Sequence, residues 1–249
     1  MLQALKDLIV VSGIDRRVRP IWRRIRGKAP DLYDEQTREI IRTRLPREAV
    51  CIDVGCNKGV ILDLLIRHRP DGRFFAFEPN PRLADVLRRK YRRNPRVTVF
   101  ELAAYSESGE TTFYVDRDSA GLSGLRDRST PEAPRKTVPI RVRTDRLDDV
   151  IPDVSPDFVK IDVEGAEFQV LEGARAMLAR SRPIVVFEFG LGGADFYGTG
   201  PDMVFDLFAE HGMRVSLMGD FLAGRPALDR DEFRRHYAEH THYYFVAHP

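Results

Sequence analysis

Carboxylate side chains stand at the ends of four apolar segments, and this pattern is the strongest sign of chemistry in the chain. Asp53, Glu78, Asp162 and Glu188 each lie at or just beyond a hydrophobic run, and a turn follows each run. Such side chains accept hydrogen bonds from hydroxyl and amino groups, or take a proton from a hydroxyl. If the runs are neighbouring parallel strands, we expect the carboxylates to converge on one crevice.

The first run leads into a turn at 55–59, and a helical pattern follows at 60–68. Gly55 and Gly59 allow the backbone to approach a ligand where a Cβ would clash. A helix behind such a turn points unpaired N–H groups at it, which suits a nucleotide-type cofactor. The turn lacks the third glycine of the dinucleotide-binding fingerprint, and a purely structural role is the alternative.

Glu78 closes the second run, 73–78, and Pro79 then stops the strand. An acidic residue at the tip of the second parallel strand is well placed to accept hydrogen bonds from a ribose diol. A solvated strand end is the plain alternative for this residue.

The third acidic group follows the run 158–161. Because positions two apart in an extended chain point the same way, we expect Asp162 and Glu164 to share a face, with Glu188 beside them. Their oxygens suit Mg²⁺ or Ca²⁺, but carboxylates acting without metal as base and hydroxyl orienters explain the same clustering, and we favour that interpretation. Helix capping is the alternative for Glu164. His242 is a further candidate base, although a lone histidine is more often surface or core.

Strands alternate with helical segments along the chain, which favours an α/β fold with a mostly parallel sheet and helices on both faces. We expect strands at 49–54, 73–78, 97–102, 158–161, 184–187, 213–217 and 243–247, and helices at 33–45, 60–69, 81–92, 166–178 and 201–211. Two alternating runs, 111–115 and 138–144, predict a hairpin insertion. The polar stretch 116–136 between them reads as a mobile loop whose part 119–125 closes over a substrate. We expect acceptor choice to depend on this loop and on the loops 190–200 and 219–230.

Composition is that of an ordinary globular enzyme. With 249 residues, 43% hydrophobic and 31% charged, the chain can build one large core. Cys51 and Cys56 are expected to be reduced thiols in a cytoplasmic protein, with no disulfide framework or zinc site. The sequence predicts no transmembrane span and no secretory signal.

Residues 1–30 form a basic arm within a chain whose net charge is only +2. Eight basic and two acidic residues alternate there with apolar ones, which predicts a basic amphipathic helix or pair of helices. Packing on the domain, or on a second subunit in a homodimer, is our leading interpretation. Contact with an anionic membrane surface comes next.

Five ordered motifs give the chain a resemblance to a known family. They are DVGCNKG at 53–59, FEPNP at 77–81, LAAYS at 102–106, TDRLDD at 144–149 and KIDVEGAE at 160–167. This series resembles that of the FkbM-type S-adenosylmethionine-dependent methyltransferases, from about residue 33 onward. The resemblance implies a Rossmann-like class I methyltransferase fold with seven strands, the seventh antiparallel between the fifth and sixth, in a domain spanning 31–249.

The resemblance also assigns residues to the cofactor S-adenosyl-L-methionine. Around its methionine part it places Asp53, Gly55, Asn57 and Gly59. It assigns the ribose to Glu78, and the surroundings of the adenosine to Pro79, Asn80, Ala103 and Ala104. Tyr33 and Glu35 are expected to cover the amino-acid end.

The function implied is O-methylation of a sugar, glycolipid or polyketide-type hydroxyl, with Asp162, Glu164, Glu188 or His242 serving as base. The partners expected are a small-molecule, glycan or lipid-linked acceptor. A nucleic-acid (RNA) methyltransferase, which would use the arginine-rich arm, is the alternative, and a non-catalytic cofactor-binding module is a third hypothesis. The protein is expected in the cytoplasm, with peripheral contact at the inner membrane face through the arm.

Overall fold

A computed structural model describes residues 32–131 and 133–249. The predicted basic arm, residues 1–30, lies outside the described residues. Within them the apolar runs form the strands of one sheet, because their β-branched and aromatic residues are buried on both faces. The first strand, Val50–Val54, is buried over four of its five residues.

Seven strands form the main sheet in the order β3-β2-β1-β7-β8-β10-β9. Six run parallel, and β10 pairs antiparallel with both β8 and β9. This confirms the predicted topology, with the last strand between the fifth and sixth. The strands are β1 (Val50–Val54), β2 (Arg73–Phe77), β3 (Val97–Phe100), β7 (Phe158–Ile161), β8 (Ile184–Glu188), β9 (Arg214–Leu217) and β10 (Tyr244–His248).

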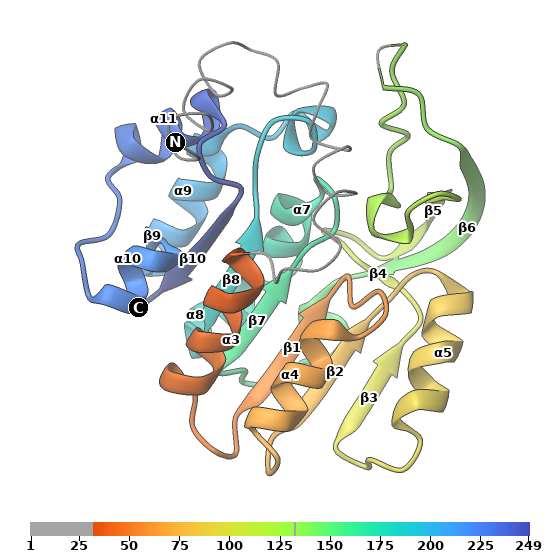
Figure 1. Ribbon diagram of the computed structural model, residues 1–249, viewed down its shortest axis with the longest axis horizontal. Coiled ribbons are helices and arrows are strands. Elements are labelled where there is room, and N and C mark those ends of the chain that lie inside the picture. Colours follow the sequence, from red (N-terminus) through yellow and green to blue (C-terminus); the bar gives the residue numbers. More distant parts are fainter. Residues whose placement is uncertain (1–31, 132) are drawn as a thin grey trace, which may run out of the picture.

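Helices cover both faces of this sheet, and each face has its own hydrophobic core. One core is closed by α3 (Leu32–Arg44), α4 (Val60–His68), α5 (Pro81–Tyr91) and α10 (Met218–Ala223). The other is closed by α6 (Leu147–Val150), α7 (Glu167–Glu172), α8 (Arg175–Ser181), α9 (Pro201–Glu210) and α11 (Arg230–Glu239). In Figure 1, α3 and α4 lie in front of the sheet.

The predicted hairpin insertion is present as a second, three-stranded sheet. Its order is β4-β6-β5, with β5 (Gly109–Asp116) antiparallel to β6 (Thr137–Asp145) and β4 (Ala103–Ala104) parallel to β6. Figure 1 shows this sheet at the upper right, beside the carboxyl ends of β1 and β2. The connection between β5 and β6 includes the short 3-10 helix η1 (Ala120–Leu122).

Three local expectations were wrong. The third strand ends at Phe100 rather than at residue 102, because the chain turns there to start the small sheet. The helix expected over 166–178 is two helices, broken near Gly173, where a Cβ would lie 2.0 Å from the Tyr105 carbonyl oxygen. The loop expected at 219–230 contains most of α10, and Asp229 opens α11 with a capping box.

Both cysteines are free and buried. Within residues 32–131 and 133–249, no helix is long and apolar enough to cross a membrane.

Candidate active site

The turn between β1 and α4 is held by the protein itself. Gly55 and Gly59 have φ of 79° and 75°, in the left-handed region. A Cβ on Gly55 would lie 1.9 Å from the carbonyl oxygen of Asp162, and one on Gly59 would lie 2.5 Å from the hydroxyl of Tyr91. Neighbouring protein atoms therefore already exclude a side chain at both positions, which is a reason for glycine in addition to the expected room for a ligand.

Glu78 is almost fully buried beside this turn. One carboxylate oxygen accepts the backbone N–H of Asn80 at 2.9 Å, and the other accepts that of Asn57 at 2.8 Å. Burial raises the pKa of Glu78 to about 7, although these two N–H groups oppose the rise. The carboxylate thus joins the turns that follow β1 and β2, and its remaining lone pairs can accept further hydrogen bonds.

Glu78 lines a narrow cavity with a volume of about 50 Å³. Pro79, Ala103 and Ala104 line it too, and the small alanines leave room opposite the carboxylate. Asn80, expected in this wall, is instead the N-cap of α5, where its side chain accepts the N–H of Arg82 at 3.1 Å. Leu102, Phe113 and Leu125 give the cavity an apolar lining that the motifs did not identify.

Asp53 lines a second, wide cavity of about 410 Å³, together with Asp34, Lys58 and Lys160. The Asp53 side chain is buried, and among the described residues its Oδ2 has no hydrogen-bond partner. Burial raises the pKa of Asp53 to about 6, against the attraction of Lys160. Buried polar atoms are normally hydrogen-bonded, so Asp53 Oδ2 is suited to a donor on a bound molecule.

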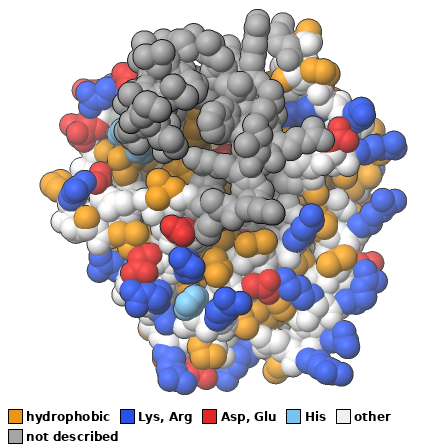
Figure 2. Space-filling model, viewed as in Figure 1, with side chains coloured by type: hydrophobic (Ala, Val, Ile, Leu, Met, Phe, Trp, Pro, Cys, Tyr) orange, Lys and Arg blue, Asp and Glu red, His pale blue; other side chains and the backbone are white. Residues whose placement is uncertain are grey.

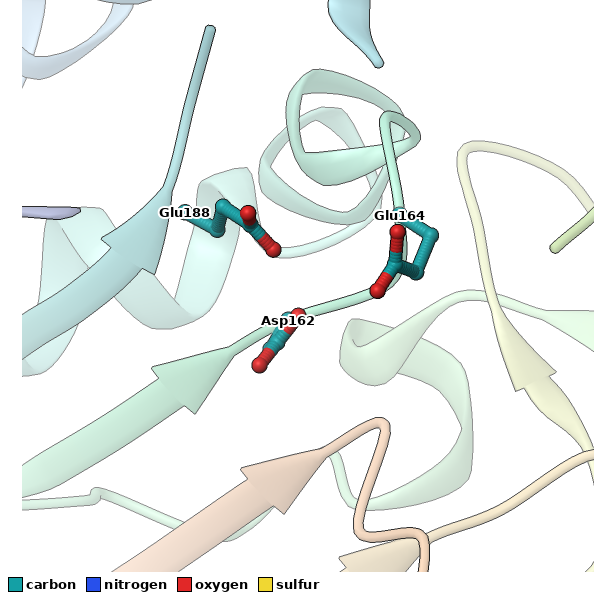
Figure 3. Close-up of side chains that lie close together, drawn as sticks. All are labelled: Asp162, Glu164 and Glu188. Carbon is teal, nitrogen blue, oxygen red and sulfur yellow. The ribbon is translucent and has the colours of Figure 1, made fainter. Parts of the chain in front are cut away.

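Asp162, Glu164 and Glu188 bring carboxylate oxygens within 4.8 Å of one another. Figure 3 shows the three side chains converging from the ends of β7 and β8 and from the turn after β7. The predicted cluster is present, but the predicted reason is wrong, because β7 ends at Ile161 and Glu164 has φ of 62°. A turn, rather than strand alternation, brings Glu164 to its neighbours. These oxygens are of the type that binds Mg²⁺.

Lys160 and Tyr244 hold Asp162, and sequence reasoning missed both. Asp162 Oδ2 accepts the Tyr244 hydroxyl at 2.6 Å and lies 3.1 Å from Lys160 Nζ. The Lys160 ammonium also lies 4.8 Å from the centre of the Tyr244 ring. Burial would raise the pKa of Asp162, but the Lys160 charge and the hydrogen bond from the Tyr244 hydroxyl hold it well below its usual value. A lysine inside a buried strand was the signal available in the sequence.

The remaining predicted residues lie around this centre. His242 stacks on His236 with ring centres 4.9 Å apart, and it lines neither cavity. Tyr33 packs against Tyr244 at 5.1 Å and accepts the backbone N–H of Tyr243. The Glu35 carboxylate is half exposed, 3.7 Å from Arg38.

The two cavities share part of their lining, and Asp162 belongs to the shared part. The other shared residues are Gly55, Asn57, Ala120 and Gly121. Asn57 Oδ1, like Asp53 Oδ2, is buried with no hydrogen-bond partner among the described residues. The crevice therefore offers Glu78 in the narrow cavity, Asp53 in the wide cavity and Asp162 in the part that the two cavities share.

S-adenosylmethionine has the parts that such a crevice can bind. Its ribose hydroxyls match Glu78, its adenine matches a small apolar wall, and its amino group matches the unpaired Asp53 oxygen. The residues present fit this cofactor.

Known proteins agree with this fit. The FkbM methyltransferase domain matches residues 53–215. The chain is 30% identical over 191 residues to the 2-O-methyltransferase NoeI of Sinorhizobium fredii, covering 72% of this chain and 77% of that protein. It is 30% identical over 159 residues to the methyltransferase sdnD of Sordaria araneosa, covering 52% and 61%.

The crystal structure of methyltransferase FkbM from Methylobacillus flagellatus KT superimposes with a TM-score of 0.53 at 17% identity. It covers 85% of this chain, which spans 48% of the length of that one. At this identity the likeness concerns the fold alone. The sheet order, the crevice at the carboxyl ends of its strands and the matched domain lead to one conclusion: the chain belongs to the FkbM family of S-adenosylmethionine-dependent methyltransferases.

Proposed function

We propose that this methyltransferase transfers the methyl group to a hydroxyl of a sugar, glycolipid or polyketide-type acceptor. The observation that carries the proposal is the position of Asp162, which lines both cavities and is held as an anion by Lys160 and Tyr244. An ionised carboxylate at this junction can orient an acceptor hydroxyl and receive its proton.

In this proposal Glu78 accepts hydrogen bonds from the ribose hydroxyls, and Ala103 and Ala104 leave room for the adenine. Asp53 accepts a hydrogen bond from the amino group of the cofactor's methionine part. When bound, the cofactor supplies an electrophilic methyl group. Asp162 aligns the acceptor oxygen, and alignment is the larger part of the catalysis. As the oxygen forms its bond to carbon its proton becomes strongly acidic, so that even a carboxylate of low pKa can accept it.

The other two carboxylates orient the acceptor in a metal-free site. Glu164 already pairs with the Arg128 guanidinium, and Asp162 lies beside the Lys160 ammonium. Two cations of the protein therefore neutralise part of the charge that a divalent ion would balance. Methyl transfer undiminished by a chelator, and not raised by added Mg²⁺, is the expected result.

The test of the proposed function has two parts. Calorimetry should detect binding of S-adenosylmethionine and S-adenosylhomocysteine. Incubation with methyl-labelled cofactor and fractionated cell glycans, lipids and RNA should label a glycan or lipid fraction, which mass spectrometry then identifies. Labelling of RNA alone would favour the nucleic-acid alternative and overturn the proposed acceptor.

We also propose that a lipid-linked acceptor is met at an anionic membrane surface. The basic arm precedes α3, which begins at Leu32, and Asp34 in the first turn of this helix lines the wide cavity. Val60, at the rim of the same cavity, is 59% exposed, so an apolar group can contact it. The arm's local excess of positive charge would attract such a surface.

Co-sedimentation with vesicles tests this placement. Replacing Arg16, Arg17 and Arg19 with Glu should abolish binding to vesicles rich in phosphatidylglycerol. Other Lys and Arg side chains gather along the lower and right-hand edges of the face in Figure 2. The matched control therefore reverses three exposed charges at the end of α5, by replacing Arg89, Arg92 and Arg93 with Glu. An equal loss of vesicle binding in both variants would contradict a specific role of the arm in membrane contact.

A further inference from the structure

Arg128, in the connection between β5 and β6, is a buried cation whose contacts extend beyond the carboxylate cluster. Its side chain is 5% exposed and pairs with Glu164, whose side chain is 9% exposed. Its Nη1 donates to the Gly192 carbonyl at 3.1 Å, and its Nη2 donates to the Leu122 carbonyl at 3.3 Å. One guanidinium therefore links the connection it belongs to with the turn after β7 and the segment after β8.

Residues 119–125 of this connection form a roof over the narrow cavity. Ala120, Gly121, Ser123 and Leu125 line the cavity together with Glu78 and Asp162. Hydrogen bonds to the hairpin shape the roof: Tyr114 and Gly124 exchange backbone bonds of 2.8 and 3.2 Å, and the Ser123 hydroxyl accepts the Asp116 N–H. The roof is thus a folded extension of the hairpin.

The roof also contacts the turn that carries Glu164. A Cβ on Gly124 would lie 3.6 Å from Glu164 Cβ, so the two segments are already in close contact. Glu164 adopts φ of 62°, which residues other than glycine rarely do. Glu167 fixes the same turn by accepting the N–H groups of Val163 and Gly165, each at 3.1 Å. The turn that carries Glu164, the partner of Arg128, is therefore rigid.

The cavity beneath the roof is small for the group proposed to enter it. Its volume of about 50 Å³ compares with roughly 300–1,000 Å³ for small-molecule sites. Its other walls are the ends of β1 and β2, the strands β4 and β5, and the turn after β7. The two sheets hold the strands in register, and the Glu167 hydrogen bonds hold the turn. Admission or release of an adenosyl group consequently requires movement of the roof.

We propose that Arg128 is a positioning residue that fastens this roof over the adenosyl group, so that exchange of the cofactor requires the Arg128–Glu164 pair to separate. The inference rests on the proposed function, since it presumes that the narrow cavity takes the adenosyl group. Lid movement of this kind limits turnover in many enzymes. Release of S-adenosylhomocysteine is accordingly slow in the parent protein and controlled from the β5–β6 connection.

The test measures the dissociation rate of S-adenosylhomocysteine by stopped-flow displacement with a fluorescent cofactor analogue. Arg128→Met should raise this rate at least tenfold, and Arg128→Lys should raise it less. The matched control is Arg126→Met, because Arg126 lies in the same connection but is exposed over the Tyr197 ring, 5.8 Å from its centre. The control should release the ligand at the parental rate.

Removing Arg128 alone leaves the Glu164 carboxylate buried without this cation, which destabilises a fold. The double variant Arg128→Met with Glu164→Gln removes both charges, and it should keep the parental melting temperature while releasing the ligand as fast as Arg128→Met. Hydrogen exchange adds a second readout, since the amides of residues 121–125 should lose protection in Arg128→Met and in the double variant but not in Arg126→Met. A merely structural role for Arg128 would change neither measurement in a folded protein.

The outcomes separate the two proposals. If the parent binds S-adenosylhomocysteine and the folded double variant releases it at the parental rate, the role of Arg128 is overturned and the proposed function stands. If the parent binds neither S-adenosylmethionine nor S-adenosylhomocysteine, both are overturned.

Discussion

Two ends of the crevice hold buried carboxylates in different ways. At the ends of β1 and β2, backbone N–H groups hold Glu78, and its pKa is raised to about 7. At the end of β7, the Lys160 and Tyr244 side chains hold Asp162, and its pKa is lowered. Both groups are desolvated, so the contrast comes from the Lys160 ammonium beside Asp162, whereas no cation among the described residues pairs with Glu78. The first end suits neutral hydroxyls, whereas the second keeps a permanent anion.

The largest effect that would test this contrast is expected from Asp162→Asn. Loss of the anion should lower methyl transfer at saturating cofactor by roughly 10²–10⁴-fold, while cofactor affinity changes by only a few-fold. Radiolabel transfer and calorimetry measure the two quantities. Asp149→Asn is the control, because that carboxylate is 52% exposed outside the crevice. An active Asp162→Asn enzyme would remove this residue from the chemistry.

Glu78→Gln should have the opposite effect to Asp162→Asn: cofactor affinity should fall more than methyl transfer at saturating cofactor. A glutamine can offer only one acceptor oxygen, so one of the N–H groups of Asn57 and Asn80 would face an amide NH₂. The loss of hydrogen bonds to a charged group corresponds to roughly 1.5–3 kcal/mol. We expect calorimetry to show cofactor Kd raised about 10- to 100-fold, with transfer at saturation affected less than in Asp162→Asn. Unchanged affinity would show that the two ends do not differ in role.

Lys160→Met should make the second end resemble the first, because Asp162 would then be a buried carboxyl group with a raised pKa, like Glu78. Without the ammonium, burial would raise the pKa of Asp162. Because Asp162 must be ionised, the acid limb of the pH–rate profile should move to higher pH, by about one unit or more. Lys160→Arg keeps the charge and should leave the limb close to that of the parent. A profile that does not move would mean that another group titrates.

Stability should also depend on pH through the first end. Asp53 and Glu78 have folded pKa values of about 6 and 7, above their ordinary values of 3.8 and 4.5. The folded state therefore binds more protons than the unfolded state between about pH 4 and 7, so the free energy of unfolding should fall as pH rises through this window. Each pKa unit corresponds to about 1.4 kcal/mol at most.

Thermal unfolding at pH 5.5 and pH 8 measures this effect. A ligand that donates hydrogen bonds to these carboxylates favours their ionised forms, so S-adenosylhomocysteine should raise the melting temperature more at pH 8. The Glu78→Gln protein should show a shallower pH dependence. A larger ligand-induced rise in melting temperature at pH 5.5 than at pH 8 would contradict the proposal that Asp53 and Glu78 accept hydrogen bonds from the ligand.

The smallest effects concern the first turn of α3. Asp34 lines the wide cavity, so Asp34→Asn should weaken cofactor or acceptor binding by a few-fold. Glu35 is half exposed and pairs only loosely with Arg38, so Glu35→Gln should change nothing measurable by calorimetry. A larger effect at Glu35 than at Asp34 would contradict the position of the cavity.

Sequence could predict the first end of the crevice because its contacts are local. Glu78 bonds to Asn80, two residues away, and to Asn57 in the preceding turn, and the strand and turn patterns show all three. The mostly parallel sheet also followed from the alternation of strands and helices, whereas the position of the last strand was implied by the resemblance to the FkbM family. Even here Asn80 was assigned to the cofactor although it caps a helix, because both roles use the same residue type.

The second end could be predicted only in part. Lys160 lies two residues from Asp162, but the other contacts are distant in sequence. Tyr244 lies 82 residues from Asp162, and Arg128 lies 36 residues from Glu164 within a polar segment with no periodic pattern. Charge alone does not say which of many arginines becomes buried. The convergence of Asp162 with Glu188 was predicted, but the groups that set its charge depend on tertiary packing.

The antiparallel strand β10 has a consequence for how the protein folds. Strands β8 and β9 have no direct pairing and are joined only through β10, the last strand along the chain. Tyr244 is its first residue. During synthesis the earlier strands can emerge and pair before this one leaves the ribosome, so the hydrogen bond that completes the reaction centre is among the last tertiary contacts to form.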